Sequence, residues 1–148
     1  NVIPDCGLVE AMQLASDRDY VALQYCTGFD HLFDQGFVMI KDFVKRWNSV
    51  RWATVACYMM YLSTLRDSHI ERKYGRQIAD TIKTTSSSIA RDFHQVKNPE
   101  SYVGQLTKFD KELKDKNYNP GTSADLTAAS LLIYNLVEKN KQECGERD

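Results

Sequence analysis

The segment best suited to bind a ligand spans residues 117–130 and reads NYNPGTSADLTAAS. Residues 119–121 predict a turn, after which Thr122 or Ser123 can cap a helix. Backbone N–H groups in the first turn of a helix lack partners within that helix, so they attract anions such as phosphate. Asp125 falls in the same turn, where its carboxylate could hold Mg²⁺ beside a phosphate or act as a base.

The same residues also fit an ordinary helix start. Thr122 and Asp125 have the spacing of a capping box, in which each side chain bonds to the backbone of the other residue. Capped helix starts are more common than phosphate sites, so this structural interpretation stays open. Gly121 has no side chain and would let a ligand come close to the backbone.

A second candidate segment covers residues 67–75 and reads DSHIERKYG. Asp67 or Ser68 can cap a helix at this point. Arg72 and Lys73 place two cations side by side, and both side-chain types bind phosphate oxygens. The alternative is a solvated, charged helix face, which is the more common meaning of such a pattern.

His69 is the histidine that stands beside these groups. A lone histidine is more often a cap or a surface residue than a general base. The sequence contains no HExxH, GxSxG, Walker or GxGxxG motif. The candidate chemistry is therefore confined to the two segments.

Helices must position both segments. Gly and Pro number 7 and 3 in 148 residues, too few for the turns of a β-rich fold. Apolar residues recur at spacings of three and four, which predicts a buried central helix over 49–66 and another over 69–93, kinked at 84–88. Further helices are predicted over 5–15, from a Ser16 cap to Gly28, over 29–40 with a break at Gly36, and over 101–114 and 123–140. We expect residues 1–148 to form a single all-α domain, a compact bundle of five to seven helices.

Composition excludes several classes of protein. Lys and Arg total 19 and Asp and Glu 20, a net charge of −1, which argues against a generally basic nucleic-acid binder or a polybasic membrane-surface protein. The longest apolar run, residues 52–62, is shorter than the about 20 residues that span a bilayer. The four cysteines lack a CxxC pair or zinc-ligand spacing. We therefore expect a reduced, cytoplasmic protein with no nucleic-acid or membrane partner.

Three segments resemble motifs of the triphosphoribosyl-dephospho-CoA synthase (CitG-type) family. Residues 119–126 are similar to the family signature (S/N)PG(G/T)(S/T)ADL, and residues 67–75 and 109–113 are similar to two further motifs. Together they cover the C-terminal half of the usual family length. Asn119 and Thr122 stand where bacterial members have Ser and Gly, so the chain looks closer to an archaeal branch.

The resemblance implies a transferase that joins ATP to 3′-dephospho-CoA, forming a ribosyl bond and releasing adenine. It implies catalytic and Mg²⁺-binding roles for Asp67 and Asp125. The residues it implies for phosphate or nucleotide binding are Arg72, Lys73, Gly121, Thr122 and Ser123. Because triphosphate and Mg²⁺ need cations and carboxylates together, we expect Asp67, Asp125, Arg72 and Lys73 to face one groove.

Two other functions stay open. The chain could be a nucleotide-binding module of the same fold without catalysis, or a helical interaction protein in which both motifs are only caps. Since the N-terminal half of the family domain is missing from the resemblance, we expect an exposed apolar face. That face would be covered by the missing half or by a second copy, and whether the chain alone is active stays open.

Overall fold

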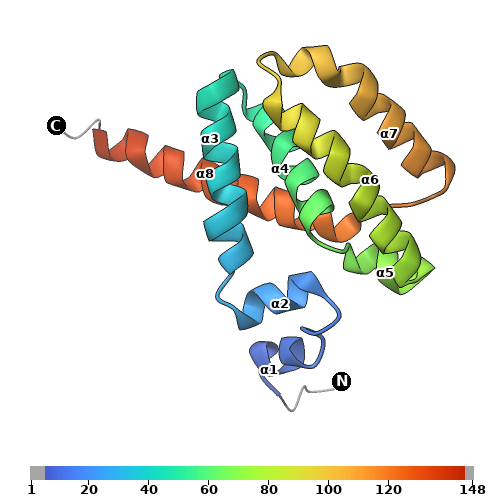
Figure 1. Cartoon of the computed structure of the whole chain (residues 1–148). Coiled ribbons are helices and arrows are strands. Elements are labelled where there is room, and N and C mark those ends of the chain that lie inside the picture. The colour runs from blue at the N-terminus through green and yellow to red at the C-terminus, as the bar shows by residue number, and fades with distance from the viewer. Residues whose placement is uncertain (1–5, 146–148) are drawn as a thin grey trace.

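The protein is built from helices arranged around α4 (Figure 1). The computed structural model describes residues 6–145, with side chains described up to residue 141. Within that range there are eight α-helices, a π-helical segment (η1), a 3-10 segment (η2) and no strand, which confirms the all-α prediction. In chain order the elements are α1 (Leu8–Gln13), α2 (Tyr20–Cys26), η1 (His31–Phe37), α3 (Val38–Trp47), α4 (Val50–Thr64), α5 (Ser68–Tyr74), α6 (Arg76–Gln95), η2 (Pro99–Tyr102), α7 (Val103–Asp115) and α8 (Gly121–Gly145).

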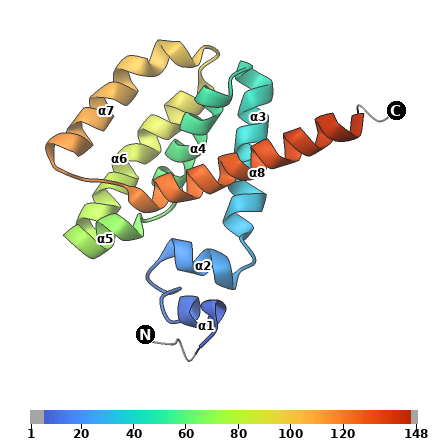
Figure 2. The same cartoon turned by 180° about the vertical axis from the view of Figure 1, so that it is seen from behind.

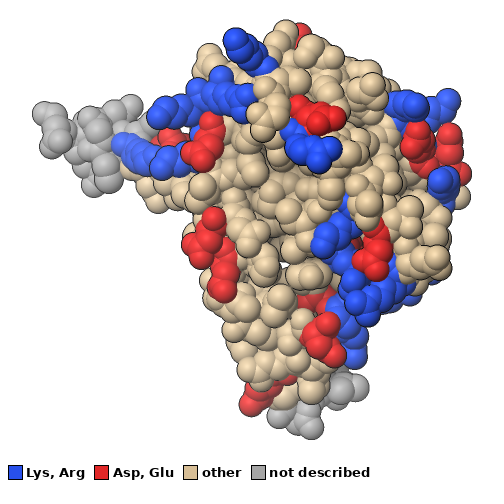
Figure 3. Space-filling model, viewed as in Figure 1, with Lys and Arg blue, Asp and Glu red and all other residues tan. Residues whose placement is uncertain are grey.

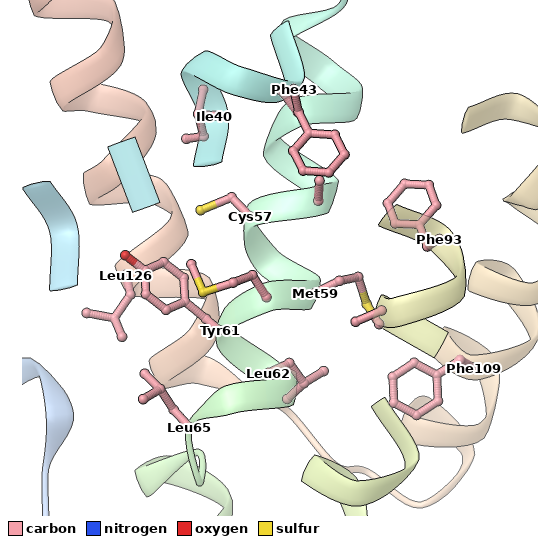
Figure 4. Packing of buried hydrophobic residues seen from close by; sticks show 14 of the residues in the cluster. Ile40, Phe43, Cys57, Met59, Tyr61, Leu62, Leu65, Phe93, Phe109 and Leu126 are labelled. Carbon is pink, nitrogen blue, oxygen red and sulfur yellow. The ribbon is translucent and has the colours of Figure 1, made fainter. Parts of the chain in front are cut away.

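Helix α4 forms the centre of the core, as its apolar sequence predicts. Ser49 caps its start by accepting a hydrogen bond from the Trp52 N–H at 3.3 Å. Helices α3 and α6 flank α4. Helix α8 packs across α4 as well, behind it in Figure 1 and in front of it in Figure 2. Figure 4 shows the α4 side chains of Cys57, Tyr61 and Leu62 pointing into this packing, and all three are buried. The chain thus buries a continuous apolar cluster through one central helix.

The predicted helix over 69–93 is divided at Gly75, and this division raises the number of α-helices to eight. Gly75 has a φ of +87°, a conformation that side-chain-bearing residues rarely adopt, so α5 ends there and α6 begins at Arg76. No break occurs at residues 84–88. Their hydroxyls hydrogen bond to carbonyls, with the Thr84 Oγ1 donating to Asp80 at 2.8 Å and the Ser86 Oγ to Leu62 at 2.9 Å.

The predicted break at Gly36 is wrong, because helical backbone continues through η1 into α3. A Cβ atom at Gly36 would overlap the side chains of Ser130 and Tyr61. The Tyr61 hydroxyl donates to the His31 carbonyl at 2.6 Å and lies 3.0 Å from the Ser130 Oγ. Gly36 is therefore needed for the close packing of η1 on α4 and α8, and it does not end a helix.

The N-terminal helices pack loosely onto this body. Helix α2 starts at Tyr20 with Asp19 as its cap, so the predicted cap at Ser16 is wrong. No residue of α1 is buried, and α2 buries only Ala22 and Gln24. Figures 1 and 2 show α1 and α2 set apart from the other helices. The predicted start of the first helix at residue 5 lies outside the described residues.

None of the described helices has the length and apolar character needed to cross a membrane. Exposed large hydrophobic side chains are present, among them Leu14, Phe33, Leu132 and Leu136. The last two lie four residues apart on α8. That an apolar face is covered by the missing half of the family domain or by a second copy stays a prediction.

Cys57 should resist thiol reagents in the folded protein. Burial raises the pKa of its thiol to about 12, so the reactive thiolate is scarce at pH 8, whereas Cys6 is exposed. Alkylation followed by peptide mass spectrometry should find Cys6 modified first and Cys57 only after urea unfolding. Equal labelling rates for Cys6 and Cys57 in native protein would contradict the burial of Cys57.

Candidate functional site

Asp67 joins the starts of α5 and α8. Its Oδ1 accepts hydrogen bonds from the His69 N–H at 3.1 Å and the Ile70 N–H at 3.2 Å, which caps α5. Its Oδ2 accepts from the Ser123 N–H at 2.8 Å and the Ser123 Oγ at 2.9 Å. With 2% of its surface exposed, this carboxylate satisfies donors in both helices, and it brings the two candidate segments together.

Hydroxyl groups extend this junction. The Oγ of Ser68 lies 2.8 Å from the Oγ1 of Thr122, which also accepts a hydrogen bond from the His69 N–H at 3.2 Å. The Tyr20 N–H donates to the Ser68 Oγ at 3.4 Å, so α2 contacts the same group. We call Asp67, Ser68, Thr122 and Ser123 the junction cluster; all four are buried. Their hydrogen-bonding capacity is largely used within the protein.

The start of α8 is neither the capping box of Thr122 and Asp125 nor a set of free N–H groups for phosphate. The helix begins at Gly121, so neither Thr122 nor Ser123 occupies the cap position. The Thr122 hydroxyl bonds to α5. Asp67 replaces a local cap by binding the Ser123 N–H from another helix. The helix start is therefore stabilised by a residue 56 positions earlier in the chain.

The cations of α5 lie outside the junction cluster, on the surface. The Arg72 side chain is 69% exposed; its Nη1 lies 3.8 Å from the Asp19 Oδ2 and its Nη2 lies 3.5 Å from the His69 Nδ1. The Lys73 Nζ lies 5.2 Å from the centre of the Tyr74 ring. Figure 3 shows basic and acidic side chains interleaved over α5 and the start of α6. Arg72 and Lys73 are thus accessible to a dissolved ligand.

His69 connects the buried and exposed parts of the site. A Cβ atom at Gly121 would lie 3.3 Å from the His69 ring, which shows how closely the ring packs on the start of α8. Asp125 lies one helical turn beyond Gly121, on the same side of α8, and is exposed. Thr122 and Ser123 are buried on a different side. Asp67 therefore belongs to the buried layer and Asp125 to the exposed layer, in place of one shared groove.

These residues alone do not fit a metal centre. Each carboxylate oxygen of Asp67 already accepts two hydrogen bonds, so a metal would have to displace a helix cap. In the part of the chain that the structure describes, no group of three His, Cys, Asp or Glu side chains could hold a metal ion. We derive no chemical step through Mg²⁺.

A small cavity lies beside the junction cluster, and sequence reasoning missed it. Its volume is about 160 Å³, and its walls come from residues 16–20, Leu23, Arg66, Ser68 and Glu71. The Arg66 Nε donates to the Asp80 Oδ1 at 2.7 Å, and this ion pair lowers the pKa of Asp80. The two acids of residues 16–19 are the sequence feature that could have indicated this cavity wall, because acids gather at helix starts.

The fold is all-α, and the junction cluster joins the starts of α5 and α8 beneath the exposed cations of α5. The family model described as CitG: ATP:dephospho-CoA triphosphoribosyl transferase matches residues 3–144. The chain therefore belongs to the CitG family, as the sequence motifs predict. Searches of curated proteins and of solved structures gave no match.

Proposed function

We propose that this chain is a triphosphoribosyl-dephospho-CoA synthase-like transferase that binds ATP and a dephospho-CoA-like acceptor. Family membership supports the reaction class. The observation that carries the placement of the phosphates is the contact between α5 and the start of α8, where the His69 ring packs on Gly121. Arg72 and Lys73 lie on the exposed side of α5, where a dissolved anion can reach both side chains.

The residues divide into two groups in this proposal. Arg72 and Lys73 bind phosphate oxygens, and Asp125 is exposed one turn beyond Gly121 on α8. Asp67 acts through His69 and Ser123 as a positioning residue, since its oxygens bind the two helix starts. Magnesium, bound to ATP, and a cytoplasmic location remain part of the proposal. We also propose that the chain corresponds to the C-terminal half of the family domain, near its archaeal branch.

A second candidate function is a helical interaction module that binds no substrate. The exposed Leu132 and Leu136 on α8 favour it, because exposed leucines one turn apart are typical of helix-packing surfaces. The two candidates differ in whether Mg·ATP binds at all.

Arg72→Ala should weaken binding of Mg·ATP about tenfold or more, since hydrogen bonds to charged groups contribute roughly 1.5–3 kcal/mol. Isothermal titration calorimetry of the full chain would measure the affinity. Arg91→Ala is the matched control, because Arg91 is 74% exposed and lies on another helix, beside Asp92. No binding by the parent protein, or equal weakening by both variants, would favour the interaction module.

Asp125→Asn should weaken Mg·ATP binding and leave the free energy of unfolding nearly unchanged, because the side chain is exposed. Repeating the titration with ATP and EDTA separates the metal-dependent part of the affinity. Equal affinities for the variant and parent in Mg²⁺ would remove Asp125 from the site.

A further inference from the structure

Two adjoining cavities form a groove along α7 that the proposed phosphate contacts do not use. The first, of about 330 Å³, lies between α4 and α7. The second, also of about 330 Å³, extends to the 117–120 loop that precedes α8. They share Tyr58, Asp110 and Leu113, so one ends where the other begins. We call this pair of cavities the α7 groove.

The two ends of the α7 groove differ in chemistry. Trp52, Tyr58 and Phe109 contribute aromatic rings to the first cavity, with aliphatic side chains around them. Lys114 and Asn117 line the second cavity, and the Lys114 Nζ lies 2.6 Å from the Asp110 Oδ2. Opposite charges in this ion pair balance, so the polar end offers donors and acceptors without a net charge. A groove with apolar walls and a few convergent polar groups is typical of small-molecule sites.

Tyr58 lines both cavities of the α7 groove. Burial raises the pKa of its phenol, and the carboxylates of Asp67 and Asp110 raise it further, so the hydroxyl stays protonated and can donate a hydrogen bond. Asp67 belongs to the junction cluster and Asp110 to the groove. Tyr58 thus contributes a hydrogen-bond donor to the wall that the two cavities share.

We propose that the α7 groove binds an uncharged nucleoside, with its flat ring among Trp52, Tyr58 and Phe109 and its sugar hydroxyls toward Asp110 and Asn117. Aromatic walls suit a flat heteroaromatic ring, which stacks on such side chains. Carboxylate and amide groups accept and donate hydrogen bonds to hydroxyls. This inference rests on the proposed function for its choice of nucleotide substrates, and it adds where the nucleoside part lies.

Adenosine, which carries no phosphate, tests the α7 groove apart from the cations of α5. The chain has two tryptophans, Trp47 and Trp52, so the full-length Trp47→Phe variant leaves Trp52 as its one tryptophan. Adenosine should change the fluorescence of that variant with saturation. Asp110→Asn in the same background should weaken adenosine binding about tenfold, whereas Asp92→Asn, an exposed acid on α6, should not.

The outcomes separate the two proposals. Adenosine binding that is weakened by Asp110→Asn and unaffected by Arg72→Ala would support the groove. Mg·ATP binding that depends on Arg72, without any response to adenosine, would overturn the groove and leave the proposed function in place. Equal effects of Asp110→Asn and Asp92→Asn would also overturn the groove. Amide chemical shifts measured by NMR during the adenosine titration should change along α4 and α7. Such changes would exclude quenching of Trp52 fluorescence without binding.

Discussion

Gly36→Ala should destabilise the protein by about 3 kcal/mol or prevent folding, since overpacking a close contact commonly costs 1–3 kcal/mol and sometimes more. The new methyl group would overlap the side chains of Ser130 and Tyr61, both of which are fully buried. Neither can withdraw easily, because the Tyr61 hydroxyl holds the His31 carbonyl at 2.6 Å. Urea unfolding followed by circular dichroism would measure the change in midpoint.

Gly104→Ala provides the control for this effect. Nothing lies within 4 Å of a Cβ atom at Gly104, which is in the first turn of α7. Alanine favours helix over glycine, so this variant should be neutral or more stable by up to about 1 kcal/mol. Similar midpoints for Gly36→Ala and Gly104→Ala would show that η1 does not pack against α8 as closely as described. If Gly36→Ala fails to fold, adding Tyr61→Phe to it should recover part of the helical signal, because one of the two overlapping groups is then gone.

Asp67→Ala should lower the free energy of unfolding by about 3–5 kcal/mol, because a cap contributes about 1 kcal/mol and each buried donor left without a partner costs roughly 1–3 kcal/mol. The substitution leaves the backbone N–H groups of His69, Ile70 and Ser123 without their carboxylate acceptor. Differential unfolding in urea, with the parent under the same conditions, would give the loss.

Two further variants show whether both halves of the Asp67 contact matter. Asp67→Asn keeps an acceptor for α5 but turns an NH₂ group toward the Ser123 donors, so its loss should be intermediate. Ser49→Ala removes a cap that serves α4 alone and should cost about 1 kcal/mol. If Asp67→Ala lowers the free energy of unfolding no more than Ser49→Ala does, then the hydrogen bonds from Ser123 of α8 to Asp67 add no stability.

Local signals in the sequence predicted much of the fold and part of the site. The spacing of apolar residues identified α4, and Asp67 was one of the two residues predicted to cap α5, because its partners are two and three residues away. Its bond to Ser123 could not be predicted, since no local pattern records a contact across 56 residues. The motif resemblance alone indicated that the two segments belong to one site.

Gly36 and Gly75 show why glycine is hard to interpret from sequence. A helix break was wrongly predicted at Gly36, and the helix end at Gly75 was not predicted. Glycine ends helices through its backbone freedom, which is its role at Gly75, with a φ of +87°. At Gly36 its lack of a side chain matters instead, and that depends on Ser130, 94 positions later. The α7 groove could not be predicted from local patterns either, because a groove depends on how far apart two helices lie.

The loose attachment of α1 and α2 has a consequence for affinity. These helices contribute two buried residues, and their polar contacts with α5 are a hydrogen bond from Tyr20 and the ion pair between Asp19 and Arg72. Segments with so little buried surface open at low free energy, well below global unfolding. Each opening releases Arg72 from Asp19. An anion that binds Arg72 therefore competes with the carboxylate of Asp19. Its apparent dissociation constant depends on the fraction of molecules in which the Asp19–Arg72 ion pair is broken.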